Sequence, residues 1–219
     1  LAEADPRIRV IDKLNTGAAD TRSCGLALAH GEYIQFADSD DHLLPGCTAN
    51  LVAAMQRSHA DLVLAPYRMM VPRKDGGYDT REYSLLPAGV YNKVDYLWQL
   101  TGHAAAFYYG VLWNKLYRRE IIMAHDIRCD EEFTWSEDML FNLSYIRYAD
   151  SFYAIRTPLY YYSRRRKHSL SASVNPAQVV TTKASLFKYY KELYVQLGLY
   201  DQYKLQIYSY LVATAKDLD

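Results

Sequence analysis

The N-terminal part of the chain alternates between short apolar runs and longer segments whose apolar residues recur at helical spacing. Apolar runs at 7–11, 33–37 and 61–67 predict buried strands. The segments 18–30 and 47–59 lie between these runs and predict helices. An alternation of strand, helix, strand, helix and strand is typical of an α/β layer with a mostly parallel sheet.

The rest of the chain follows a less regular pattern that ends in two helices. The predicted elements are helices at 91–101 and 137–149, a half-strand, half-helix segment at 111–122 and an extended segment at 152–163. From Pro176 onward the spacing is helical with a break at Gly198, which predicts a helical hairpin lying on the α/β layer. We therefore divide the chain into an α/β domain over 1–172 and a C-terminal helical extension over 173–219. Contact with a membrane surface and pairing into a homodimer are both open roles for this extension.

Composition narrows the class of protein. The chain has 219 residues with 25 basic and 25 acidic side chains, and this balance argues against a nucleic-acid binder, which needs a basic face. No apolar run approaches the roughly 18 residues of a membrane span. The three cysteines lack zinc or disulfide spacing, so we expect reduced thiols in a cytoplasmic protein. Because the chain opens on Leu1 without Met or a signal peptide, we expect that it continues a longer protein.

A cluster of carboxylates follows the apolar run at 33–37. Asp38, Asp40 and Asp41 lie where a strand of the predicted sheet ends, which is where α/β sheets bind ligands. Carboxylates this close repel one another unless a cation intervenes, and oxygen ligands select magnesium, manganese or calcium. Such a site suggests a metal-bound phosphate or diphosphate. The alternative is a solvated turn whose Asp residues cap the next helix.

Two further segments carry candidate chemistry. Glu137 and Asp138 follow Ser136, a good N-cap residue, and could supply a general base or simply favour the helix dipole. Downstream, the cations at 164–167 precede His168 and Ser169 in a segment that could close over phosphate oxygens or be a solvated charged loop.

The order of these signals resembles the family 2 glycosyltransferases of bacterial polysaccharide assembly, which have a GT-A (Rossmann-like) fold. The family stretch N-x-G-x-x-x-A-R-N-x-G-L-x-x-A-x-G-E-Y-I-x-F-x-D-S-D-D is matched by NTGAADTRSCGLALAHGEYIQFADSDD at 15–41. Arg22 is kept, whereas Thr21 and Ser23 replace the usual Ala and Asn. VLWNKLYRREII, WSEDMLFNL and YYYSRRRKHSLS match further family segments. The I-P-x-Y-N and V-D-D-G-S stretches that grip the nucleoside in family members are missing, so we expect an N-terminally truncated GT-A domain.

The resemblance also implies roles for individual residues. Asp38 and Asp40 form a D-x-D that holds the donor diphosphate through manganese or magnesium, and Asp138 is the catalytic base with Glu137 beside it. The remaining residues implied to lie near the diphosphate are Asp41, Arg22, Arg166, His168 and Ser169.

The function implied by the resemblance is a metal-dependent inverting transfer of a sugar from a nucleoside-diphosphate donor, with UDP as the expected nucleotide. The acceptor is a hydroxyl of a saccharide or of a polyprenyl-linked molecule, which would place the enzyme at the inner membrane face. A second reading is a non-catalytic carbohydrate-binding or scaffold domain of the same fold. A haloacid-dehalogenase-type phosphatase fits less well, because it requires Thr or Val where His42 stands.

Overall fold

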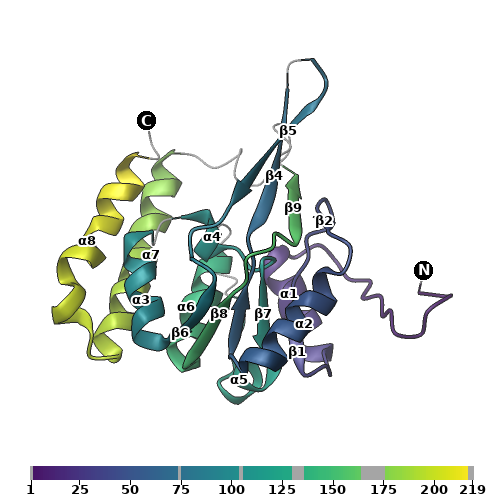
Figure 1. Ribbon diagram of the computed structural model, residues 1–219, viewed down its shortest axis with the longest axis horizontal. Coiled ribbons are helices and arrows are strands. Elements are labelled where there is room, and N and C mark those ends of the chain that lie inside the picture. The colour runs from purple at the N-terminus through teal and green to yellow at the C-terminus, as the bar shows by residue number, and fades with distance from the viewer. Residues whose placement is uncertain (1, 74, 104–105, 130–135, 164–175, 217–219) are drawn as a thin grey trace.

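A computed structural model describes residues 2–73, 75–103, 106–129, 136–163 and 176–216 of the chain. It shows an α/β layer with helices packed around a central sheet, and a β-hairpin that projects from one end (Figure 1). The helices are α1 (Ala18–Leu28), α2 (Cys47–Ser58), α3 (Lys93–Gly102), α4 (Phe107–Gly110), α5 (Arg119–Ala124), α6 (Glu137–Tyr148), α7 (Pro176–Gln196) and α8 (Tyr200–Lys216). The strands are β1 (Tyr33–Gln35), β2 (His42–Leu43), β3 (Leu62–Leu64), β4 (Tyr67–Pro72), β5 (Tyr78–Tyr83), β6 (Gly89–Asn92), β7 (Lys115–Arg118), β8 (Ser151–Ala154) and β9 (Tyr160–Ser163).

The central sheet has the order β1-β7-β3-β8-β6 and is mixed. Only β3 and β8 form a parallel pair in it, so the prediction of a mostly parallel sheet is wrong, although the α/β class is confirmed. β1 and β3 do run in the same direction, as the strand–helix–strand pattern predicts. They are not neighbours, because β7 lies between them and pairs antiparallel with each.

The predicted strand at 7–11 does not form. Its apolar side chains are exposed, with Val10 at 76%, and no strand in the described part of the chain pairs with it. A strand needs a neighbour to satisfy its backbone N–H and C=O groups and to cover its apolar face. The described residues supply neither, and local apolar spacing is therefore not enough to make this segment a strand.

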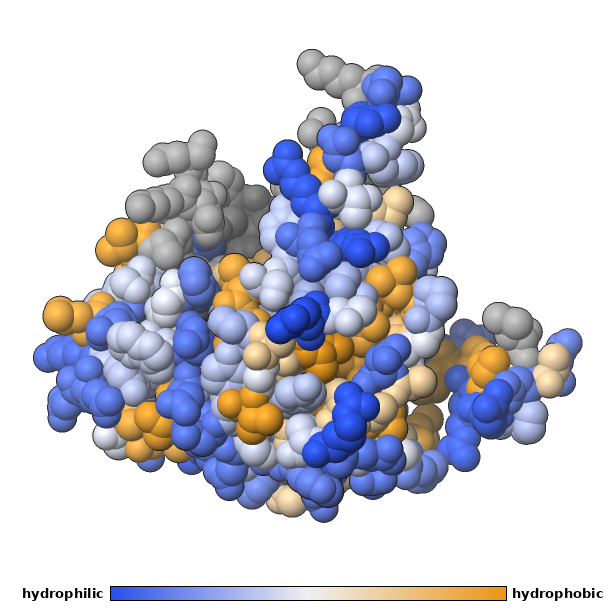
Figure 2. Space-filling model, viewed as in Figure 1, coloured by the Kyte–Doolittle hydropathy of each residue, from blue (hydrophilic) through white to orange (hydrophobic). Residues whose placement is uncertain are grey.

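A second sheet of order β2-β9-β4-β5 positions the acidic turn after β1. β2 follows that turn directly and pairs with β9, which ties the turn to a strand more than a hundred residues later in the chain. β4 and β5 form the projecting hairpin, and Figure 2 shows that its face on this side is mostly hydrophilic. The turn is thus anchored at the junction of the two sheets.

The C-terminal helices share one hydrophobic core with the α/β layer. α7 packs on α6 and α8 packs on α3, and the chain turns between α7 and α8 at Gly198, whose φ of +71° favours glycine. Tyr190, Tyr194 and Ile207 are fully buried in the same cluster as the sheet residue Phe152. The predicted helical hairpin is confirmed, and it contributes to the core rather than lying loosely on it.

Tyrosine fills much of that core. Tyr96 stacks on Phe152 with ring centroids 3.9 Å apart, and Tyr160 stacks on Trp113 at 4.2 Å.

Within the described residues, no helix is both long and apolar enough to span a membrane.

Candidate active site

Arg22 joins the two acidic segments that the sequence singles out. Its Nη1 donates to Asp138 Oδ1 at 2.6 Å and to Glu137 Oε1 at 2.9 Å, and its Nη2 donates to Asp38 Oδ1 at 3.0 Å. One guanidinium therefore spans carboxylates that lie 16 and 116 positions away along the chain. The predicted metal-binding turn and the predicted base belong to one site.

Three elements bring these side chains together. Arg22 lies on α1, Asp38 follows β1, and Glu137 and Asp138 form the first turn of α6. Burial alone would lower the pKa of Arg22, but the charges of Asp138 and Asp38 outweigh it, and the pKa is raised. The arginine is thus permanently charged and holds the acidic groups in place.

Asp138 is the most strongly perturbed carboxyl group of the site. Burial raises its pKa to about 7, and the neighbouring charges of Glu137 and Asp38 act in the same direction. Arg22 and Lys115 oppose that rise. A buried carboxyl whose pKa lies near neutrality, with specific charged partners, is typical of a group that exchanges protons in its function.

Ser136 adds local strain beside this carboxyl. It occupies the N-cap position of α6 as predicted, but its side chain makes no capping hydrogen bond and its φ is +72°. A left-handed conformation is unfavourable for a residue other than glycine and is often found at functional sites. The cap expected from the residue type is therefore absent, and the backbone bends sharply just before Glu137.

Asp41 is held by β9 and does not contact Arg22. Its Oδ2 accepts from the Tyr160 hydroxyl at 2.8 Å and its Oδ1 accepts from the Ser163 N–H at 2.8 Å. The Tyr160 oxygen also accepts from the Asp38 N–H at 3.1 Å. Burial raises the pKa of Asp41 to about 6. These bonds fix the shape of the 38–41 turn. The expected contact of Asp41 with a diphosphate stays a prediction.

The chemistry of the turn fits a divalent cation. Asp40 is exposed and the Asp38 side chain is 33% exposed, so both carboxylates can be reached from solvent. Among the described residues, no group of three or more His, Cys, Asp or Glu side chains is placed so that it could hold a metal ion. Magnesium-type sites usually use one or two protein carboxylates and complete their coordination with water and phosphate oxygens. Asp38 and Asp40 are the residues that could hold such an ion.

The remaining predicted residues, Arg166, His168 and Ser169, lie outside the described residues. Conversely, the structure adds groups that sequence reasoning missed. Lys115 and Asn142 are buried polar side chains next to the site. The signal was present, since Asn142 interrupts the apolar run at 139–143, and Lys115 together with Asn114 interrupts the apolar and aromatic stretch at 111–117.

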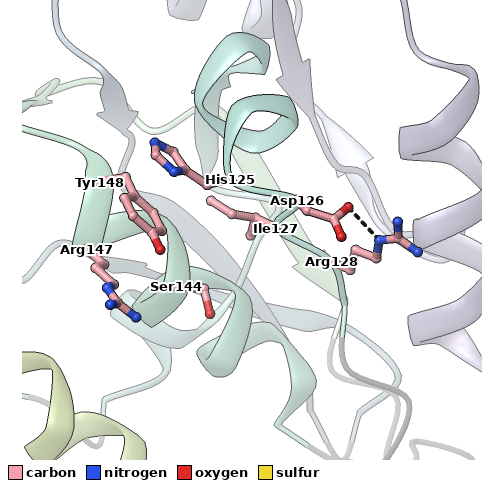
Figure 3. A pocket seen from close by; sticks show the side chains of 7 residues that line it. All are labelled: His125, Asp126, Ile127, Arg128, Ser144, Arg147 and Tyr148. Carbon is pink, nitrogen blue, oxygen red and sulfur yellow. Dashed lines mark hydrogen bonds and ion pairs between the residues drawn. The ribbon is translucent and has the colours of Figure 1, made fainter.

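A surface hollow of about 340 Å³ lies elsewhere, between the segment 125–128 that follows α5 and the later turns of α6 (Figure 3). His125 stacks on Tyr148 there, and Asp126 pairs with Arg128. None of the predicted site residues lines it, and Asp138 is at the opposite end of α6. The hollow is therefore separate from the Arg22 cluster.

Comparison with known proteins agrees with this architecture. The family model described as "Glycosyl transferase family 2" matches residues 1–122. The uncharacterized glycosyltransferase EpsJ of Bacillus subtilis is 32% identical over 174 residues, which cover 78% of this chain and 48% of EpsJ. The poly(ribitol-phosphate) beta-N-acetylglucosaminyltransferase TarS of Staphylococcus aureus is 24% identical over 176 residues, covering 78% of this chain and 28% of TarS. The matched part of the chain spans about half the length of EpsJ and less than a third of the length of TarS.

Solved structures support the fold. The crystal structure of S. aureus TarS 1–349 in complex with UDP-GlcNAc superposes with a TM-score of 0.63 at 18% identity, covering 95% of this chain and 64% of that chain. This likeness confirms the GT-A fold that the motifs imply. Because the family model matches residues 1–122, which are more than half of the chain, the chain belongs to glycosyl transferase family 2.

Proposed function

We propose that the chain is the catalytic part of an inverting glycosyltransferase that uses a nucleoside-diphosphate sugar and a divalent cation. The observation that carries this proposal is the Arg22 bridge, because it brings Asp38, on the metal side, to Asp138, on the base side. A donor bound at the 38–40 turn would lie within reach of both. The hydroxyl acceptor would enter beside Asp138.

Transfer then follows from one displacement. An Asp138 oxygen takes the proton of the acceptor hydroxyl, and the acceptor oxygen forms a bond to the anomeric carbon. The bond between that carbon and the diphosphate oxygen breaks, and the diphosphate keeps the electron pair. Attack opposite to the leaving group inverts the configuration at the carbon.

The chain's own residues support this step in two ways. A pKa of about 7 makes Asp138 a base strong enough to accept a proton at neutral pH, while part of its population remains ionised. Arg22 lies between the donor side and the base, where its charge can balance the leaving diphosphate. A cation held by Asp38 and Asp40 would neutralise charge on the same diphosphate when bound.

The donor class rests on similarity. TarS has been crystallised with UDP and with UDP-GlcNAc, and we propose a UDP-sugar here. The TarS name gives a hydroxyl-bearing polymer, poly(ribitol-phosphate), as its acceptor, which supports transfer to a hydroxyl here. We propose a hydroxyl of a saccharide or of a polyprenyl-linked molecule, and the latter would bring the protein to a membrane surface. The phosphatase alternative finds no support, because family and fold both differ.

The test is UDP release from a panel of UDP-sugars with Mn²⁺ and a hydroxyl acceptor. Asp138→Asn should lose about 10²–10⁴-fold in turnover while it still binds UDP and Mn²⁺. Glu137→Gln is the matched control, since it removes a neighbouring carboxylate from the same turn and should retain far more activity. Full turnover by Asp138→Asn would exclude it as the base. Mn²⁺-dependent UDP binding without transfer by the wild type would favour the non-catalytic binding domain.

A further inference from the structure

Lys115 is a fully buried cation that the proposed displacement does not use. Its Nζ donates to the carbonyl oxygens of Tyr108 at 3.2 Å and Val111, and to Asn114 Oδ1 at 2.8 Å. Three acceptors around one nitrogen require three N–H donors, which only the protonated amine has. Burial lowers the pKa of Lys115 to about 7, and the carboxylate of Asp138 opposes that change.

Asn142 connects the same carbonyl groups to the base. Its Nδ2 donates to the carbonyl oxygens of Gly110 at 2.6 Å and Asp138 at 2.9 Å, with a longer contact of 3.4 Å to Val111. Its Oδ1 accepts from the Tyr117 hydroxyl at 2.9 Å. Lys115 and Asn142, together with the carbonyl groups of 108–111, form what we call the carbonyl clamp. It links β7, α4 and the first turns of α6.

We propose that Lys115 is a positioning residue of the proposed transferase. Its ammonium holds the carbonyl clamp together and serves as the fixed counter-charge on the buried side of Asp138. This inference rests on the proposed function for its catalytic meaning, but the electrostatic part can be measured without any activity.

The two cations near Asp138 differ in what else they bind. The charged groups that act on this carboxyl are Arg22, Glu137, Asp38 and Lys115. Arg22 also binds the donor-side carboxylate of Asp38, so a bound diphosphate competes for its guanidinium. Lys115 is held by three internal acceptors, so its ammonium group stays in place when a donor binds. It therefore keeps Asp138 ionised at the stage when Arg22 turns toward phosphate.

A purely structural role for Lys115 makes a different prediction. A buried lysine that only satisfies carbonyl groups would affect stability and leave the proton affinity of Asp138 unchanged. The two roles are separated by comparing Lys115→Met with Tyr117→Phe. Both variants remove a donor from the same buried region, but only the first removes a charge.

The experiment is a ¹³C carboxyl titration by NMR of the wild type and both variants, with the Asp138 signal assigned by its loss in Asp138→Asn. We expect Lys115→Met to raise the pKa of Asp138 by about one unit, a tenfold change in proton affinity, and Tyr117→Phe to leave it unchanged. In the transfer assay, the acid limb of the kcat/KM profile should move to higher pH by the same amount. An unchanged Asp138 titration in folded Lys115→Met would overturn the proposal.

A measurement on the wild type covers the case in which Lys115→Met does not fold. With ¹⁵N-labelled lysine, the Lys115 Nζ should show an ammonium signal at pH 6, below its pKa of about 7, because its three acceptors favour the charged form. A neutral amine at pH 6 would refute the counter-charge. If both NMR results hold and no sugar transfer occurs, the proposed function is at fault and the electrostatic role of Lys115 stands.

Discussion

Replacing Asp138 by Asn should make the protein more stable as well as less active. The pKa of this carboxyl rises from 3.8 to about 7 on folding, because burial disfavours the charged form. Below pH 3.8 the group is protonated in both the folded and the unfolded state and costs nothing. Between these values the unfolded chain ionises and the folded protein does not, so stability falls as the pH rises. Above pH 7 the cost is constant.

The size of the effect follows from that shift in pKa. A shift of one pKa unit corresponds to about 1.4 kcal/mol. The rise in pKa from 3.8 to about 7 therefore lowers the free energy of unfolding by about 4 kcal/mol at pH 8. The Asp138 side chain is only 20% exposed, and little of this is screened by solvent. The value is an upper limit for Asp138→Asn, because Arg22 loses one of its three partners in the variant.

The assay is urea unfolding of the wild type and Asp138→Asn at several pH values from 4.5 to 8.5. The free energy of unfolding of the variant should exceed that of the wild type by a margin that grows with pH and levels off above 7. Asp40→Asn is the control, since Asp40 is exposed and its replacement should change stability little at any pH. A margin that does not depend on pH, or a variant less stable than the wild type at pH 8, would refute the assignment of a raised pKa to Asp138.

Three other variants test the frame of the site. Arg22→Gln leaves buried carboxylates without their cation and should cost about 3 kcal/mol or more in urea unfolding at pH 8, less at pH 5. Tyr160→Phe removes the hydroxyl between Asp41 and the Asp38 N–H, and should lower stability by about 1–3 kcal/mol and weaken Mn²⁺ binding measured by calorimetry. Ile207→Ala should cost about 2–5 kcal/mol in a single unfolding transition, because α8 shares the main core, whereas a separate early transition would show an independent extension.

The sequence alone predicted the element types but not how the strands pair. Apolar spacing identified β1, β3 and the long helices because that spacing reflects which face of an element is buried. The direction of a neighbouring strand depends on the connection that leads into it. Nothing within 111–122 indicates that β7 would insert antiparallel between β1 and β3. The run at 7–11 fails for a related reason, since its spacing specifies a strand only when a neighbour is available.

The candidate site shows the same division. The types of side chain in the D-x-D and E-D segments indicated acid, base and metal chemistry before any contact was known. The contacts themselves join residues 116 positions apart, and Arg22 was expected to bind the donor alone. Lys115 could have been suspected, because a lysine within an apolar and aromatic stretch is costly to bury unless its charge has partners.

Taken together, these contacts explain how the proposed base, Asp138, can be kept inside this fold. A carboxyl of ordinary pKa would be stable at the surface but would be a poor proton acceptor at neutral pH. Burial of Asp138 raises its pKa toward the working pH, and this same burial makes the folded protein less stable when the group ionises. The charges of the partly buried Arg22 and the fully buried Lys115 both favour the ionised form of Asp138 and so limit that cost. Because Arg22 also reaches Asp38, a donor bound at the proposed site would change this interaction while that of Lys115 stays constant, and the proton affinity of the proposed base would then depend on occupancy of the donor site.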